Sequence, residues 1–157
     1  MKLSRMGLEL IKTFEGFRTS PYLCPAGIPT IGYGCTYYSD GRRVRLSDPS
    51  IDETSATILL QNILASYERG VDSFTRNDIT QNQFDALVSF AYNVGISGLR
   101  NSTLLRLVNA DPLNRRIRKE FMRWVYADGR KIKGLKIRRE REVEMYFAKT
   151  EKNLIDI

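Results

Sequence analysis

Three side chains of different chemistry lie close together near the start of the sequence. Eight residues separate Glu15 from Cys24, and five separate Cys24 from Thr30. A carboxyl, a thiol and a hydroxyl that meet in the fold could transfer a proton and orient a water molecule. Histidine is absent from the chain, which excludes Ser-His-Asp and Cys-His catalysis and imidazole metal ligands. Acid–base chemistry would therefore depend on Asp, Glu, Lys, Tyr or Cys.

The segments on either side of these residues should position them. Apolar residues recur at helical spacing over residues 3–14, which predicts an amphipathic helix that ends at Gly16. Glu15 then falls on the last turn of this helix or just beyond it. Residues 19–48 combine Gly and Pro with Tyr and Ile, which favours a small antiparallel sheet of two or three strands. Ser39-Asp40-Gly41 is typical of a hairpin turn within it.

Helical patterns fill the rest of the sequence. Capping boxes that begin at Ser50 and Thr80 predict the first two helices. Asp111 followed by Pro112 predicts an N-cap and first position for a later helix, which should bury Leu113. The helices are expected over residues 50–71, 80–95, 103–109, 112–125 and about 137–149.

These elements predict an α+β fold. An N-terminal helix and a small antiparallel sheet should pack against a mostly helical lobe, with an active-site cleft between them. Residues 1–157 are expected to form a single domain, with a β lobe over about 17–50 and a helical lobe from 1–16 and 51–157. No metal or cofactor is indicated, because two cysteines are too few for a four-cysteine zinc site.

The net charge of +7 favours polyanionic partners. Nucleic acid, an anionic membrane surface and bacterial wall polymers are all polyanions, and charge alone does not choose among them. No nucleic-acid recognition motif accompanies the charge. No apolar run reaches the length of a membrane span, and the first 14 residues mix charged and apolar side chains, unlike a signal peptide.

Five blocks follow one another along almost the whole chain. They are Phe14-Glu15-Gly16, Thr30-Ile31-Gly32-Tyr33-Gly34, residues 85–95 (DALVSFAYNVG), residues 101–105 (NSTLL), and Gly134-Leu135 with Arg138, Arg139 and Glu142. Each block alone is a modest signal, but five in order are specific. Together they resemble the phage-type lysozymes of glycoside hydrolase family 24, which include many bacteriophage endolysins.

The resemblance implies a lysozyme-like fold and an activity. The activity would be hydrolysis of bacterial peptidoglycan at the β-1,4 bond from N-acetylmuramic acid to N-acetylglucosamine, without metal or cofactor. Glu15 matches the family's general acid, and Cys24 and Thr30 match the residues that position or activate water, with inversion of configuration. The general acid must stay protonated near neutral pH, which partial desolvation favours. The residues that would bind the sugar chain are Gly34, Tyr92 and Ser102.

The chain departs from the family at two positions. Many relatives carry Asp in place of Cys24, and the common run T-I-G-Y-G-H-T has its His replaced by Cys35. A thiolate with a lowered pKa could activate water, whereas a neutral thiol would position it weakly. That His often braces the catalytic Glu, and Arg138 or Arg139 could take over the role. Alternatively, both arginines lie on a solvated helix face and pair with Glu142.

Simpler interpretations and other functions stay open. Glu15 could be a solvated carboxylate, Cys24 a small semi-buried side chain and Thr30 an ordinary strand residue. The main alternative function is a catalytically impaired peptidoglycan-binding protein with the same fold; nucleic-acid binding and membrane disruption are further ones. We expect a monomer with peptidoglycan as its partner, no nucleic acid and no stable membrane insertion. The protein should gather in the host or bacterial cytoplasm and act on the wall after release, through a holin-type pore if it comes from a phage.

Overall fold

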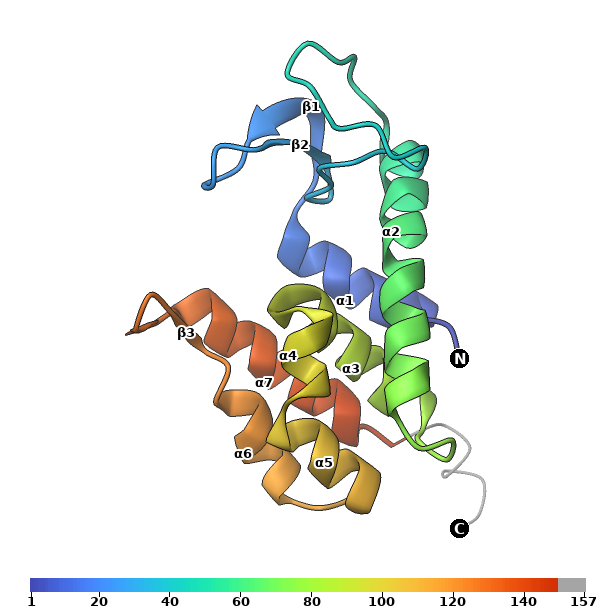
Figure 1. The fold of residues 1–157 in the computed structure, drawn as a ribbon, viewed down its shortest axis with the longest axis vertical. Coiled ribbons are helices and arrows are strands. Elements are labelled where there is room, and N and C mark those ends of the chain that lie inside the picture. The colour runs from blue at the N-terminus through green and yellow to red at the C-terminus, as the bar shows by residue number, and fades with distance from the viewer. Residues whose placement is uncertain (150–157) are drawn as a thin grey trace. The chain divides into compact units, whose positions relative to one another are not determined.

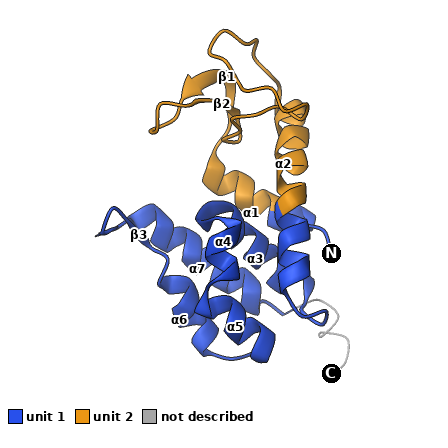
Figure 2. Ribbon diagram, viewed as in Figure 1, with its two compact units in different colours: residues 1–7, 67–157 blue, residues 8–66 orange. Residues whose placement is uncertain are grey.

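The computed structural model describes residues 1–149. Contacts divide the chain into two compact units, residues 8–66 and residues 1–7 together with the chain from residue 67 onward (Figure 2). The fold is α+β and rich in helices, as the sequence predicts, and it contains two small antiparallel sheets. Within the described residues, no helix is both long and apolar enough to cross a membrane. That the chain forms a single domain stays a prediction.

The unit of residues 8–66 contains the first sheet. Strand β1 (Arg18–Leu23) pairs antiparallel with β2 (Pro29–Gly32), and their register shifts within β1 (Figure 1). The predicted turn at 39–41 is confirmed, because Tyr37 and Arg43 form an antiparallel bridge across it. The core of this unit contains Ile31, Cys35, Val44 and Leu59, with Tyr38, Ile51 and Ile63 packed against them.

Helix α1 (Arg5–Glu15) ends where the sequence predicts. Gly16 adopts a φ of 70°, a backbone conformation that residues with a side chain rarely adopt. Its N–H still donates to the Lys12 carbonyl at 3.1 Å. Glu15 is therefore the last helical residue. Its carboxyl projects from a helix end that leads directly into β1.

Helix α2 (Glu53–Phe74) begins later than predicted. The Asp52 carboxylate accepts a hydrogen bond from the Ser55 N–H at 2.7 Å, which is the bond made by an N-cap residue. The Ser50 hydroxyl instead lies 2.7 Å from that of Ser20 in β1. The capping box at Ser50 is therefore wrong, because a carboxylate nearer to the helix end is the stronger acceptor and Ser50 is bound to the sheet.

The second unit is organised around helix α3 (Gln81–Val94). The predicted capping box is confirmed: Thr80 Oγ1 accepts from the Gln83 N–H at 3.1 Å, and Gln83 Oε1 accepts from the Thr80 N–H at 2.9 Å. Residues 83–91 are all buried. Helix α7 (Lys133–Phe147) packs along α3 and covers part of this surface.

Shorter elements complete the second unit. They are α4 (Ile96–Arg100), α5 (Thr103–Ala110), α6 (Arg116–Met122), β3 (Tyr126–Ala127) and β4 (Arg130–Lys131) (Figure 1). Asp111 ends α5 as its C-cap, so the predicted N-cap at this residue is wrong. The Pro112 carbonyl accepts a hydrogen bond from the Tyr146 hydroxyl at 2.8 Å, which holds this segment as a turn ahead of α6. Leu113 is 72% exposed and is not part of the core.

Two elements have no counterpart in the sequence prediction, α4 and the β3–β4 hairpin. The hairpin turn is formed by Asp128 and Gly129, with φ values of 51° and 74°. Positive φ at both central residues is characteristic of a type I′ turn, for which Asp-Gly is a favoured pair. The sequence therefore did carry a signal for this hairpin.

Arg138 and Arg139 are buried in α7 rather than solvated. Arg139 Nη2 donates to Glu142 Oε1 at 2.6 Å, and Arg138 Nε lies 3.4 Å from the same oxygen. The predicted pairing with Glu142 is confirmed, and the solvated face is wrong. Burial raises the pKa of Glu142 to about 7, and the two guanidinium groups oppose that rise. Arg139 also bonds Asn93 at 2.9 Å, which ties α7 to α3.

We predict that Thr80→Ala lowers the free energy of unfolding by about 1 kcal/mol, because it removes the N-cap acceptor of the central helix. Urea denaturation followed by circular dichroism measures the change. Thr54→Ala, at an exposed position in the first turn of α2, is the control and should alter stability by less than about 0.5 kcal/mol. Equal effects of the two changes would contradict the capping role.

Candidate active site

The Glu15 carboxyl lies against a tight turn that follows β2. Ile31 and Cys35 exchange two backbone hydrogen bonds of 2.9 and 3.0 Å, and Gly32 and Gly34 adopt φ values of 64° and 79° within the turn. A Cβ atom added to Gly34 would stand 3.3 Å from Glu15 Oε2. Glycine at this position therefore permits both the backbone conformation and the close approach of the carboxyl.

Tyr33, also in this turn, is held by a polar clamp. It is 4% exposed, and its hydroxyl donates to Glu53 Oε1 at 3.0 Å. Lys12 Nζ lies 3.6 Å from the same carboxylate oxygen and 5.1 Å from the centre of the Tyr33 ring. Burial, and then the bond to Glu53, raise the pKa of Tyr33. The clamp connects the last turns of α1 with the turn and with the start of α2.

Cys24 occupies the tight loop between β1 and β2. Its N–H donates to the Ile28 carbonyl at 3.0 Å, and its carbonyl accepts from the Gly27 N–H at 2.8 Å. The side chain is half-buried and the thiol is free. Hydrogen bonding from the Ile28 N–H lowers the pKa of the Cys24 thiol most. Desolvation, the next largest effect, opposes it, and the Ala26 N–H and the Thr30 hydroxyl lower the pKa further. The loop thus favours the thiolate.

Thr30 is positioned to act on the Cys24 sulfur. Its side chain is almost completely buried, and its hydroxyl donates to the Ile28 carbonyl at 2.8 Å. A hydroxyl has a single proton, which must leave the Ile28 carbonyl if it is to stabilise a thiolate. The Thr30 hydroxyl is therefore a rotating donor that can serve either the backbone or the sulfur.

Cys35 has the opposite environment. It is 1% exposed and unpaired with Cys24. Burial first, and then the negative charge of Glu15, raise its pKa to about 12. At this position, where the resemblance expects His, the thiol is neutral at ordinary pH. Unlike an imidazole, it does not become a cation on protonation. Both cysteines are free thiols in this structure.

Tyr92 and Ser102 belong to the other unit. The Tyr92 ring is half-buried and stands edge-on to Tyr67, with centroids 5.2 Å apart. Ser102 is the N-cap of α5: its hydroxyl donates to the Leu99 carbonyl at 2.7 Å and accepts from the Leu105 N–H at 3.0 Å. The substrate roles of Tyr92 and Ser102 stay predictions.

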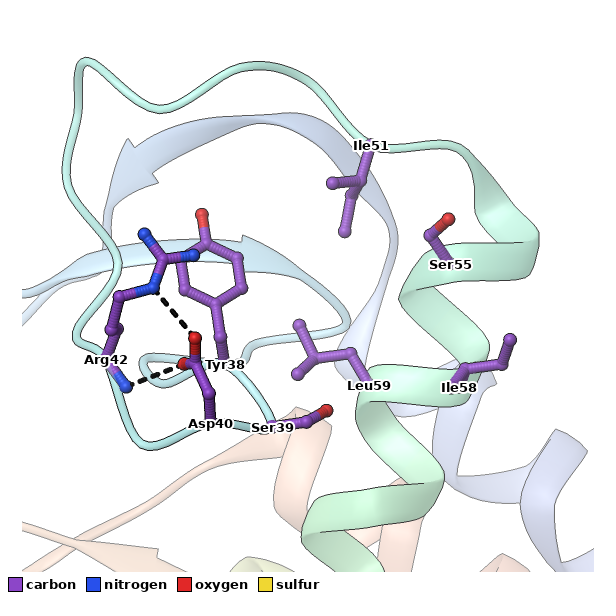
Figure 3. A pocket seen from close by; sticks show the side chains of 8 residues that line it. All are labelled: Tyr38, Ser39, Asp40, Arg42, Ile51, Ser55, Ile58 and Leu59. Carbon is purple, nitrogen blue, oxygen red and sulfur yellow. Dashed lines mark hydrogen bonds and ion pairs between the residues drawn. The ribbon is translucent and has the colours of Figure 1, made fainter.

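The unit of residues 8–66 also has a pocket of about 380 Å³, which the sequence did not predict. Figure 3 shows Ile51 and Leu59 on its apolar side and Asp40 and Arg42 at its polar edge. The Arg42 guanidinium already pairs with Asp40 at 2.9 Å, so the two charges neutralise each other. None of the predicted site residues lines this pocket. Within residues 1–149, no group of three His, Cys, Asp or Glu side chains could hold a metal ion.

We predict that iodoacetamide modifies Cys24 and spares Cys35 in the native protein. The lowered pKa of Cys24 leaves more reactive thiolate at neutral pH than an ordinary cysteine has, so its rate should level off at a lower pH. Thr30→Val should slow the reaction at pH 7, because the hydroxyl donor is lost, whereas Cys35→Ser should not. Peptide mass spectrometry over time gives the rates, and preferential labelling of Cys35 would contradict the assignment.

Comparisons with known proteins agree with this fold. The family model described as phage lysozyme matches residues 12–142. The chain is 40% identical to an endolysin of Bacillus phage B103, over 98% of this chain and 57% of that protein. It thus spans little more than half the length of the Bacillus phage endolysins that it resembles.

Two solved structures extend the likeness. An endolysin from Escherichia coli O157:H7 phage FAHEc1 superposes with a TM-score of 0.86 at 36% identity, over 94% of each chain. The muramidase domain of SpmX from Asticaccaulis excentricus gives a TM-score of 0.80 at 32% identity, over 94% of this chain and 99% of that one. From the sequence match and the shared fold together, we conclude that this chain belongs to the phage lysozyme family.

Proposed function

We propose that the chain is a lysozyme that cleaves the β-1,4 bond between N-acetylmuramic acid and N-acetylglucosamine in bacterial peptidoglycan. Family membership supports the reaction class. The observation that carries the proposal is local: Glu15 ends α1 with its carboxyl against the Gly34 turn, and the same compact unit holds a thiol with a lowered pKa beside a hydroxyl. These are the acid and the water-directing groups that glycoside hydrolysis requires.

Glu15 is the proposed general acid. Its carboxyl would protonate the glycosidic oxygen as the bond to the leaving sugar breaks, and it must be protonated before that step. The side chain is half-buried, and the buried Cys35 thiol next to it carries no charge at neutral pH.

Cys24 and Thr30 are the proposed water-directing pair. A thiolate at Cys24 would accept a proton from the attacking water, and the Thr30 hydroxyl would orient that water or the sulfur. The water would attack the anomeric carbon on the face opposite to the leaving oxygen, which gives inversion of configuration. In the absence of thiolate formation, the pair would only hold the water in place, with a slower reaction.

The remaining assignments belong to the same proposal. Gly34, Tyr92 and Ser102 would bind the sugar chain, and the protein would act as a single domain and a monomer. It would reach the wall after release from the cell in which it is made. The alternative is a peptidoglycan-binding protein with an impaired site, which the thiols at the usual Asp and His positions make worth testing.

We predict that Glu15→Gln lowers the rate of digestion of purified peptidoglycan by at least about a hundredfold, because the amide cannot donate the required proton. Binding to the same walls should be retained, and Glu9→Gln, on an exposed part of α1, should keep activity as the matched control. Identification of the new reducing ends as N-acetylmuramic acid would establish the bond that is cleaved. Equal digestion by native protein and Glu15→Gln would exclude the proposed acid.

We predict that the first-formed product has the inverted anomeric configuration, since water attacks directly. Proton NMR during the first turnovers distinguishes the two anomers before they interconvert. Cys24→Ser should slow the reaction, because a hydroxyl is a far weaker base than a thiolate, while leaving the product anomer unchanged. A retained configuration would exclude single displacement by water.

A further inference from the structure

The net positive charge of the chain comes from one of its two units. Residues 8–66 contain five Lys and Arg against six Asp and Glu, whereas the rest of the chain contains 20 against 12. Within that remainder, residues 115–136 hold nine Lys and Arg against two Asp and Glu. This short stretch, the basic segment, thus carries a net charge equal to the +7 of the whole protein.

The basic segment is continuous in sequence and lies within the second unit. It comprises α6, the β3–β4 hairpin and the first turn of α7, which follow one another in Figure 1. The Ile132 N–H donates to the Val125 carbonyl at 2.8 Å and closes the base of the hairpin. All nine cations are exposed, namely Arg115, Arg116, Arg118, Lys119, Arg123, Arg130, Lys131, Lys133 and Lys136. Of the two acids, Glu120 is buried and Asp128 is exposed.

Few of these cations are neutralised within the protein. Arg123 pairs with Glu120 at 3.4 Å and Lys136 with Glu140 at 3.7 Å. The other seven have no carboxylate within 4.0 Å among residues 1–149. The Arg118 guanidinium stacks 4.4 Å from the Phe147 ring centre, an arrangement that keeps its charge. The positive charges of these seven side chains therefore face solvent.

The helix dipoles disfavour the cations at the starts of α6 and α7. Lys133 and Lys136 occupy the first turn of α7 and Arg116 begins α6, and neither helix has an acidic residue in its first turn. The amino-terminal end of a helix is its positive end, where cations are unfavourable and carboxylates favourable. These exposed cations therefore lie where the helix dipole disfavours positive charge, which indicates a role in binding a partner rather than in folding.

We propose that the basic segment binds a phosphodiester polymer of the bacterial cell wall. Regularly spaced single negative charges on a flexible chain match cations spread over two helices and a hairpin, and release of counterions would drive the association. Duplex nucleic acid fits less well, because the seven-residue α6 is too short to follow a groove. The inference rests on the proposed function, since the wall is where the enzyme would act.

The test compares two triple variants in the Glu15→Gln background, which leaves the walls undigested. One carries Arg115→Gln, Arg116→Gln and Lys119→Gln in the basic segment. The control carries Arg18→Gln, Arg43→Gln and Arg45→Gln, which are exposed cations of the 8–66 unit, so both variants lose three charges. Co-sedimentation measures binding to Gram-positive walls with their phosphodiester polymer intact and to the same walls stripped of it by hydrofluoric acid.

We expect the basic-segment variant to lose at least about tenfold in affinity for intact walls, and the control less than about threefold, with the difference vanishing on stripped walls and at high salt. Equal losses of affinity in both variants would show that net charge alone determines wall binding, and would overturn the proposal. So would the same loss on stripped walls, or tighter binding of duplex DNA than of intact walls at equal salt.

Folding and catalysis are checked separately. Thermal melting of the basic-segment variant should stay close to that of the native protein, because Arg115 and Arg116 leave the positive end of α6 while Lys119 leaves its last turn, where a cation is favourable. With Glu15 restored, the variant should digest stripped walls at the native rate. Failure of the native protein itself to digest stripped walls would refute the proposed function and leave the binding result intact.

Discussion

Two reciprocal hydrogen bonds between Ile31 and Cys35 close a three-residue turn on which the candidate site is built. Both residues belong to the core of their unit, so the turn cannot move without disturbing that core. Between them, Gly32 and Gly34 adopt positive φ, and the lack of a side chain at Gly34 leaves room for the Glu15 carboxyl. The Tyr33 clamp then fixes the turn to α1 and α2. Backbone packing and this clamp together hold the turn beside the Glu15 carboxyl.

The two cysteines show how position within one unit determines chemistry. Cys24 lies in a loop whose N–H groups and Thr30 hydroxyl favour the thiolate. Cys35 is enclosed by apolar side chains and lies close enough to Glu15 to feel its charge, so it stays a thiol. The thiolate is thus favoured at one sulfur and disfavoured at the other, although the side chains are identical.

Local signals predicted most of the helices but not every boundary. The capping box at Thr80 forms as predicted. The one at Ser50 does not, because Asp52 is closer to the start of α2 and Ser20 binds the serine. Asp is a residue type typical of an N-cap, yet Asp111 is the C-cap of α5, the helix that precedes it. Arg138 and Arg139 suggested a solvated face, and only the packing of α7 on α3 buries them.

The sequence alone determined the order of the elements, Glu15 at a helix end, the family and the total charge, because helix periodicity, glycine turns and composition are local properties of the chain. Only the tertiary structure decided which thiol can ionise, which arginines are buried and which unit carries the charge. Those properties depend on desolvation and on neighbours distant in sequence. Glu15 and Gly34 are 19 positions apart in the chain, and only the fold brings the carboxyl to the turn.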